Sequence, residues 1–289
     1  MSRREYWILI LPSLLVMFGL LLVPMYRTIE WSLQDVNYGE PGTFVGLDNY
    51  VVALTDPRFA ASVGFTVGLT LAVMTVVIVL GYVLAVLVNN LRRMRPLVLG
   101  ILLISYVIPG VVGATMFSWL FDTNFGGVAN VILGWLGQGD LLWFTDTWPN
   151  RVMIALNVIW AMLPFSMLIL LAGLQGVPKE IIEAATIDGA GTWGRHFHVI
   201  LPSIRGMVGF VAIICIMDVL RVFDNLIPLA PNAILNGNES IALYTYNMAF
   251  QDGGQQLGLG SVINVLTIMI MIVMLIPFLR NTIREAKSA

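Results

Sequence analysis

Long apolar segments alternate with short polar segments along this chain, and each apolar segment is long enough to cross a membrane as a helix. About 20 apolar residues in a helix span the ~30 Å hydrocarbon core of a bilayer. Lipid leaves the backbone no outside hydrogen-bond partner, and the runs are too long and too continuously apolar for barrel strands. We therefore predict an all-α, polytopic membrane protein with six transmembrane helices, at residues 7–26, 60–88, 97–121, 151–173, 206–229 and 257–279.

The composition supports this class. The chain has 289 residues, of which 58% are hydrophobic and 11% are charged, whereas a soluble domain has about 25% charged residues. Too few charges remain to cover a water-exposed surface. The net charge of −2 says little about partners, because the charges are segregated along the chain. The single cysteine, Cys215, lies inside an apolar run, which excludes a disulfide framework and a cysteine-rich metal site.

The first apolar segment has a second interpretation, as a cleaved signal peptide. Its apolar run is too long for one, and the residues after it, Val23-Pro24-Met25-Tyr26, are too bulky for a cleavage site. We therefore expect this segment to remain as the first helix.

Basic residues are concentrated on one side of the predicted bundle. By the positive-inside rule that side faces the cytoplasm, so we expect both termini and the segment 174–205 to be cytoplasmic and the acidic loops to face outward. Only Arg27, Arg58, Arg151 and Arg221 fall elsewhere. The basic residues that set this orientation are Arg3, Arg4, Arg92, Arg93, Arg95, Lys179, Arg195, Arg205, Arg280, Arg284 and Lys287.

The most patterned polar segment is 183–202, which reads E-A-A-T-I-D-G-A-G-T-W-G-R-H-F-H-V-I-L-P. Apolar and charged residues alternate at helical spacing over 179–186, and Gly189 follows as a helix-ending residue. A second short helix is predicted over 192–199, and Pro202 closes the unit. Such an elbow has a small apolar face with charges at its rim, which suits a helix-in-groove contact.

The elbow resembles the "EAA" loop of ABC importer permeases. Glu183-Ala184-Ala185 is followed after three residues by Gly189, and after nine more by Val199-Ile200-Leu201-Pro202, where the family usually has Ile at the position of Val199. The resemblance implies a type I importer permease fold with a coupling helix that docks into a cleft of an ATP-hydrolysing subunit. The alternative is an ordinary loop that contains a helix. The coupling residues it implies are Glu183, Ala184, Ala185, Asp188, Gly189, Leu201 and Pro202.

Three further segments resemble the first permease subunit of carbohydrate importers of the maltose/glycerol-phosphate type. They are Phe44-Val45-Gly46-Leu47-Asp48-Asn49-Tyr50 (F-x-G-L-x-N-Y), Val222-Phe223-Asp224-Asn225 (the F-D segment) and Tyr244-Thr245-Tyr246-Asn247-Met248-Ala249-Phe250 (Y-x-Y-x-x-A-F). One departure is Leu229-Ala230-Pro231-Asn232, where the family often has L-T-x-G-G-P. The shape of the outer loop and the exact sugar therefore stay open.

The resemblance also implies the partners and the location. The chain would pair with a second homologous permease, with two ATP-binding subunits that hold ATP and Mg, and with an extracytoplasmic binding protein. The cargo would be a sugar or sugar derivative: a polyol, an oligosaccharide or an anionic sugar. The complex would lie, surrounded by lipid, in a bacterial or archaeal inner membrane. The chain itself has no G-x-x-x-x-G-K-[ST] loop for ATP phosphates, so we expect no catalysis, no cofactor and no nucleic-acid binding in this subunit.

The fifth segment contains charges, which are costly inside a membrane. Asp218, Arg221 and Asp224 recur every three residues and would share one helical face. Each would cost ~2.5–3.5 kcal/mol at mid-bilayer. They either line a polar substrate pathway, which Asn225 would extend, or pair with the partner permease or snorkel to the outer surface. Both interpretations stay open.

Other candidates for the pathway lie on the fourth and sixth segments. Asn157 and Trp160 offer a hydrogen bond and a stacking face for a sugar ring, and Asn264, with Ser261, offers further hydrogen bonds. Trp160 and Phe165 fall near the substrate contacts that the resemblance implies for the fourth helix. Isolated polar residues in such helices more often bond across helices than contact substrate.

Proline and glycine inside the segments predict local breaks. Pro109-Gly110 and Pro164 would each remove a backbone hydrogen bond and bend their helices. Such breaks persist where they are buried in protein or line a cavity. A packing kink and a substrate contact are both compatible with the sequence.

Two other functions fit parts of the sequence. Charges in the fifth segment also suit an ion-coupled secondary transporter of a small polar solute, but such proteins are built from inverted repeats, which are not evident here, and the elbow would have no role. His196 and His198 suggest a metal site, yet side chains two apart lie on different sides of a helix and no acidic or thiolate cluster joins them.

Overall fold

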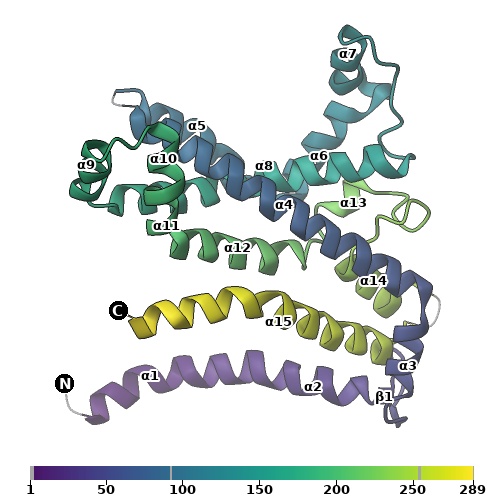
Figure 1. Cartoon of the computed structure of the whole chain (residues 1–289). Coiled ribbons are helices and arrows are strands. Elements are labelled where there is room, and N and C mark those ends of the chain that lie inside the picture. The colour runs from purple at the N-terminus through teal and green to yellow at the C-terminus, as the bar shows by residue number, and fades with distance from the viewer. Residues whose placement is uncertain (1–2, 92, 253–254, 289) are drawn as a thin grey trace. The chain divides into compact units, whose positions relative to one another are not determined.

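The computed structural model describes residues 3–91, 93–252 and 255–288, and almost all of its regular structure is helical (Figure 1). The chain divides into two compact units, of which the first comprises residues 1–60 and 243–270 and the second residues 61–242 and 271–289. Within the described residues, four helices are long and apolar enough to cross a membrane, and two bent helix pairs raise the number of candidate spans to as many as six. Arg92 falls outside the described residues.

The first unit begins with one helical run, drawn in purple in Figure 1. It consists of α1 (Arg3–Met17), a π-helical stretch η1 (Phe18–Leu22) and α2 (Val23–Ser32). None of the most apolar part of this run is buried within the chain. The helix was expected to end at Tyr26 but continues to Ser32, and within the extension Arg27 pairs with Glu30 one turn later at 2.7 Å, a spacing that stabilises a helix.

The F-x-G-L-x-N-Y segment lies on short elements that follow α2. Strands β1 (Gln34–Asp35) and β2 (Thr43–Phe44) pair antiparallel and lead into α3 (Asp48–Thr55). Gly46 adopts a φ of +62°, which glycine tolerates best. Asn49 donates to the carbonyl of Gln34 at 2.8 Å, and the hydroxyls of Tyr50 and Ser32 lie 2.9 Å apart. The motif residues therefore fix the turn.

The Y-x-Y-x-x-A-F segment lies on α14 (Ile241–Tyr246) and the π-helical η4 (Asn247–Gln251), ahead of the last helix, α15 (Leu257–Ser288). The hydroxyl of Tyr244 donates to Asp56, and Asp56 also accepts from the backbone N–H of Arg58 at 2.8 Å. The guanidinium of Arg58 lies over the Tyr244 ring and pairs with Asp252 at 2.8 Å. This cluster holds the start of α4 within the first unit.

The second unit is built on α4 (Pro57–Asn90), α5 (Arg95–Val107), α6 (Gly110–Phe121), α8 (Thr147–Gly176) and α12 (Arg205–Val219). The buried residues of α4, α8 and α12 form its core, including Val73, Val77, Met167, Leu170 and Ala212. The predicted break at Pro109-Gly110 is confirmed: α5 and α6 meet at an angle of 99°. Pro164, in contrast, lies inside α8, which continues through it as one helix.

Two buried asparagines organise the loops around η2 (Thr123–Phe125) and α7 (Val128–Trp135). Asn130 accepts from the Trp143 indole at 2.8 Å and bonds both backbone groups of Leu141. Asn150, which has no exposed surface, donates to the carbonyls of Trp143 and Leu229 and accepts from Asn238. The side-chain amide atoms of both asparagines therefore find their hydrogen-bond partners within the protein, and these bonds hold the loops in place.

The fifth predicted segment differs from the sequence interpretation. We expected one helix over 206–229, but α12 ends at Val219, residues 220–225 form turns and irregular backbone, and only a short helix, α13 (Leu226–Leu229), follows. Asp224 and Asn225 are residues that favour turns over helix interiors. The prediction that Asp218, Arg221 and Asp224 share a helical face is therefore wrong.

Candidate functional site

The elbow consists of two helical arms joined by a glycine turn, as predicted. The first arm, α9 (Lys179–Ile187), extends one residue beyond the predicted helix. Gly189 has a φ of +83°, its N–H bonds the carbonyl of Thr186, and the N–H of Ala190 bonds the carbonyl of Ala185 at 2.9 Å. These two bonds define a Schellman motif, which requires a left-handed residue at the glycine position.

The second arm is longer and less regular than predicted. It contains α10 (Thr192–Arg195), a π-helical stretch η3 (His196–Ile200) and α11 (Leu201–Ser203). Pro202 does not end this arm but sits in the first turn of α11, where its missing N–H costs no hydrogen bond. Arg195 braces the two arms by donating to the hydroxyl of Thr186 on α9 at 3.1 Å.

Large apolar side chains of the elbow are open to the surroundings. Ile187 is 85% exposed, Trp193 76% and Phe197 58%, and the two aromatic rings stack with centroids 6.0 Å apart. We call these three residues the elbow face. The predicted coupling residues Glu183, Ala184, Asp188, Gly189 and Pro202 are exposed as well, whereas Ala185 and Leu201 are partly buried.

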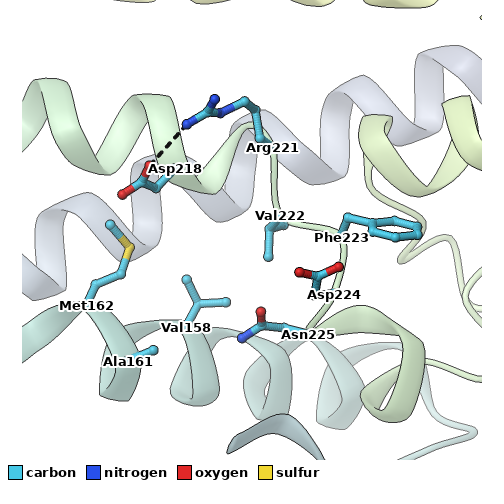
Figure 2. A pocket seen from close by; sticks show the side chains of 9 residues that line it. All are labelled: Val158, Ala161, Met162, Asp218, Arg221, Val222, Phe223, Asp224 and Asn225. Atoms are coloured by element: carbon cyan, nitrogen blue, oxygen red, sulfur yellow. Dashed lines mark hydrogen bonds and ion pairs between the residues drawn. The ribbon is translucent and has the colours of Figure 1, made fainter. Parts of the chain in front are cut away.

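A polar pocket of about 430 Å³ lies between α8 and the end of α12 (Figure 2). Its polar lining comes from Asp218 and the turn that follows α12. Arg221 pairs with Asp218 at 3.4 Å, and both side chains are more than half exposed. Asp224 and Asn225 approach the same space from the turn, as Figure 2 shows. With two carboxylates and one guanidinium, the lining carries a net charge of −1.

All three predicted pathway charges thus meet at one pocket, although they do not share a helix. The apolar wall opposite them is formed by Val158, Ala161 and Met162 of α8. These three residues were not predicted from the sequence. Their spacing, i, i+3 and i+4, places them on one helical face, and this signal was available in the sequence.

Asn157 is buried and is not among the residues that line the pocket. It has no exposed surface, and its carbonyl oxygen accepts from the Asn225 amide at 2.6 Å. Its own Nδ2 has no hydrogen-bond partner within the described residues. A Cβ on Gly110, the first residue of α6, would lie 3.1 Å from the Asn225 oxygen. Asn225 therefore connects α8 to the point where the α5–α6 pair is broken.

The other predicted pathway residues are not among those that line the polar pocket. The ring of Trp160 packs against Phe117 with centroids 5.3 Å apart and borders a mainly apolar pocket of about 400 Å³. Phe165 stacks on Tyr106 at 5.4 Å. Asn264 is exposed on α15, in the first unit.

Comparison with known proteins identifies the family. Residues 77–284 match the family described as "Binding-protein-dependent transport system inner membrane component". This chain belongs to that family. It is 30% identical over 275 residues to the trehalose/maltose transport system permease protein MalF of Thermococcus litoralis, covering 95% of this chain and 92% of the relative. It is 32% identical over 222 residues to the sulfoquinovosyl glycerol transport system permease protein SmoG of Agrobacterium fabrum, covering 75% and 71%.

The fold agrees with that of a solved ABC transporter. A chain of the bacterial alginate ABC transporter, crystallised with an alginate pentasaccharide-bound periplasmic protein, superposes with a TM-score of 0.81 at 20% identity, covering 95% of this chain and 92% of that chain. This likeness concerns the fold alone.

The protein is accordingly a permease subunit of a binding-protein-dependent ABC importer of sugars or oligosaccharides. It is a non-catalytic, multi-pass subunit of the inner membrane with the ABC importer permease fold. The predictions of fold class and of general function are confirmed. The alternative of an ion-coupled secondary transporter is excluded by the family.

Proposed function

We propose that ATP-driven motion enters this permease through the elbow and acts on the polar pocket, where the sugar passes. The partners are a second homologous permease, two ATPase subunits that bind ATP and Mg, and an extracytoplasmic binding protein. The alginate transporter was crystallised with its periplasmic protein, which supports the last of these. The F-x-G-L-x-N-Y and Y-x-Y-x-x-A-F segments favour assignment to the first permease subunit.

The observation that carries this proposal is the elbow face. Exposed Trp193, stacked on Phe197 and accompanied by Ile187, is costly in water unless a partner covers it. Tryptophan is among the residues that dominate binding energy at interfaces. A short amphipathic helix with acidic Glu183 and Asp188 beside its apolar residues suits a groove on a soluble subunit.

The internal bonds of the elbow support its use as a rigid handle. The Schellman turn at Gly189 and the bond from Arg195 to Thr186 hold the two arms at a fixed angle. A force applied to the elbow face would therefore move both arms together. The distribution of basic residues supports a cytoplasmic position for the elbow and for both termini, which is where an ATPase subunit is found.

The polar pocket suits a hydroxyl-rich solute. The carboxylate of Asp224 can accept hydrogen bonds from sugar hydroxyls, and the amide of Asn225 offers both acceptor and donor atoms. Because Arg221 is already paired with Asp218 and the lining is net negative, the pocket favours a neutral sugar or polyol over an anionic one. Asn157 would act through Asn225 rather than by touching the sugar.

The test is to purify the complete complex with elbow-face variants of this chain. Trp193→Ala with Phe197→Ala should remove a large part of the interface, at about 2 kcal/mol or more per dominant residue, so the ATPase subunits should be lost from the purified complex. Trp135→Ala, which removes another strongly exposed tryptophan (81%) on α7, is the matched control and should retain them. Full retention of the ATPase subunits by the double variant would refute the docking site.

The same purified complex also tests the cargo. ATP hydrolysis is measured with the binding protein loaded in turn with neutral, phosphorylated and carboxylated sugars. We expect stimulation by a neutral sugar or polyol. Stimulation by the anionic sugars alone would contradict the proposed preference of the polar pocket.

A further inference from the structure

A side-chain hydrogen bond connects the elbow to the membrane helices of the second unit. The hydroxyl of Tyr82 on α4 and Nδ1 of His196 on the elbow lie 2.6 Å apart. The two rings meet edge to face at 87°, with centroids 5.9 Å apart. Of the side-chain hydrogen bonds within the described residues, this is the one that joins residues 178–203 to another helix.

An open hollow borders the His196 side of this hydrogen bond. A pocket of about 220 Å³ lies at the joint, between the end of α4 and both arms of the elbow. Its lining includes Asn89, Leu174, Ile182 and His196. Where packing is incomplete, neighbouring elements lack the dense contacts that make protein interiors stiff. A directed hydrogen bond therefore carries a larger share of the connection here than it would in a close-packed core.

His196 is also the first residue of the π-helical stretch η3. Short π-helical turns inside helices are uncommon and occur frequently at functional sites. The irregular turn thus begins at the residue that makes the contact with α4.

From Tyr82 the contacts continue to the polar pocket. The neighbouring Gly81 lies against α8, since a Cβ there would be in ordinary van der Waals contact with Leu170 at 3.4 Å and with the backbone of Met167 at 3.6 Å. Both of these residues are fully buried. The same helix, α8, contributes Val158 to the wall of the polar pocket. A contiguous packed route therefore runs from the elbow through α4 and α8 to the pocket.

We propose that Tyr82 and His196 are positioning residues for coupling: their hydrogen bond transmits the movement of the elbow to α4 and so to α8. This proposal rests on the docking of the elbow to an ATPase subunit proposed above. Neither residue lines the polar pocket. Loss of the bond should leave ATPase binding intact and lower the amount of sugar moved for each ATP hydrolysed.

The experiment uses the complete complex in proteoliposomes and measures sugar uptake and ATP hydrolysis on the same samples. Tyr82→Phe and His196→Leu each remove the hydrogen bond while keeping most of the packing volume. A single hydrogen bond of typical net strength predicts a fall of about 2- to 10-fold in uptake per ATP. His196→Asn retains a polar atom near the position of Nδ1 and should recover much of this loss.

Two control variants remove the same chemical groups elsewhere. Tyr106→Phe removes a hydroxyl from a ring that stacks on Phe165, and His198→Leu removes an imidazole whose Nδ1 contacts the carbonyl of Gly194 within the same arm. Both should keep the uptake-to-hydrolysis ratio of the unaltered complex. The double variant Tyr82→Phe/His196→Leu should be no worse than either single variant, because both act on one contact.

Each outcome decides the proposal. The proposal is overturned if both single variants keep the normal uptake-to-hydrolysis ratio, or if the losses add in the double variant. It is also overturned if uptake, hydrolysis and thermal midpoint fall in parallel, because that result indicates a merely structural role. Failure of the proposed docking is seen separately, as retention of ATPase subunits by the Trp193/Phe197 variant. If that variant loses the ATPase subunits while Tyr82→Phe keeps a normal uptake-to-hydrolysis ratio, the docking proposal is supported and the role of the Tyr82–His196 hydrogen bond is refuted.

Discussion

Replacement of Gly189 by valine should uncouple ATP hydrolysis from transport without preventing membrane insertion. The glycine has a φ of +83°, and a Cβ added there would meet no heavy atom within 4 Å. The cost is therefore backbone strain rather than a steric clash. A left-handed conformation costs an L-residue about 1–2 kcal/mol, and a β-branched residue lies at or above the upper end of that range. This shifts the equilibrium away from the native turn about 5- to 30-fold.

The strain from this substitution acts at the turn of the elbow, so coupling rather than membrane insertion should be affected. The turn sets the angle between α9 and the second arm, and the membrane helices do not contain it. We expect normal amounts of inserted protein, and sugar uptake per ATP reduced about 5- to 30-fold in proteoliposomes. Gly189→Asn should be milder, because asparagine enters the left-handed region more readily than other non-glycine residues.

Gly191 provides a matched control two residues away. Its φ of −65° and ψ of 171° are allowed for any residue, and a Cβ there would also meet nothing within 4 Å. Gly191→Ala should therefore transport normally. If Gly189→Val and Gly191→Ala behaved alike, the argument from left-handed strain would be refuted.

Three further changes test the fold and the pocket. Tyr244→Phe removes a hydrogen bond to a carboxylate and should lower the free energy of unfolding by about 1.5–3 kcal/mol, seen as a lower thermal midpoint in detergent; an unchanged midpoint would contradict this. Asn150→Leu leaves the carbonyls of two residues and the amide of a third without their buried partner, so a loss of about 3 kcal/mol or more and poor yield are expected. Arg221→Gln breaks an ion pair with Asp218 that is more than half exposed and worth under about 1 kcal/mol; the thermal midpoint should hardly change, so a raised KM for sugar uptake would report on the pocket itself.

The features that the sequence predicted well are those decided by local chemistry. The helices were predicted from the length of the continuous apolar segments. The break between α5 and α6 was predicted from the Pro109-Gly110 pair. The elbow was predictable because Gly189 sits where a helix must end and only glycine accepts the required φ without strain.

The fifth segment was predicted wrongly because hydropathy does not distinguish apolar helix from apolar turn. Residues 220–229 are largely Leu, Val, Phe and Ile, yet α12 stops at Val219. The turn-forming Asp224 and Asn225 were assigned to a polar stripe on a helix, and their preference for turns was not given enough weight. The charges nevertheless border one pocket, because the turn folds back beside Asp218.

Long-range hydrogen bonds were beyond the reach of the sequence. Asn157 was chosen as a sugar contact because a lone amide in an apolar helix is conspicuous, but its partner, Asn225, lies 68 residues away. Asn150 escaped notice for the same reason: it bonds Leu229, 79 residues along the chain. Nothing in the local pattern indicates which distant carbonyl a buried amide will meet.

Cys215 has a practical consequence for experiments on this transporter. It is the sole cysteine of the chain, and it has no accessible surface. A thiol introduced at an exposed position outside the elbow face, such as Gly191, would thus be the one thiol on this subunit that a maleimide dye or spin label could reach. The surroundings of the elbow can then be followed by this one label during turnover in an otherwise unaltered sequence.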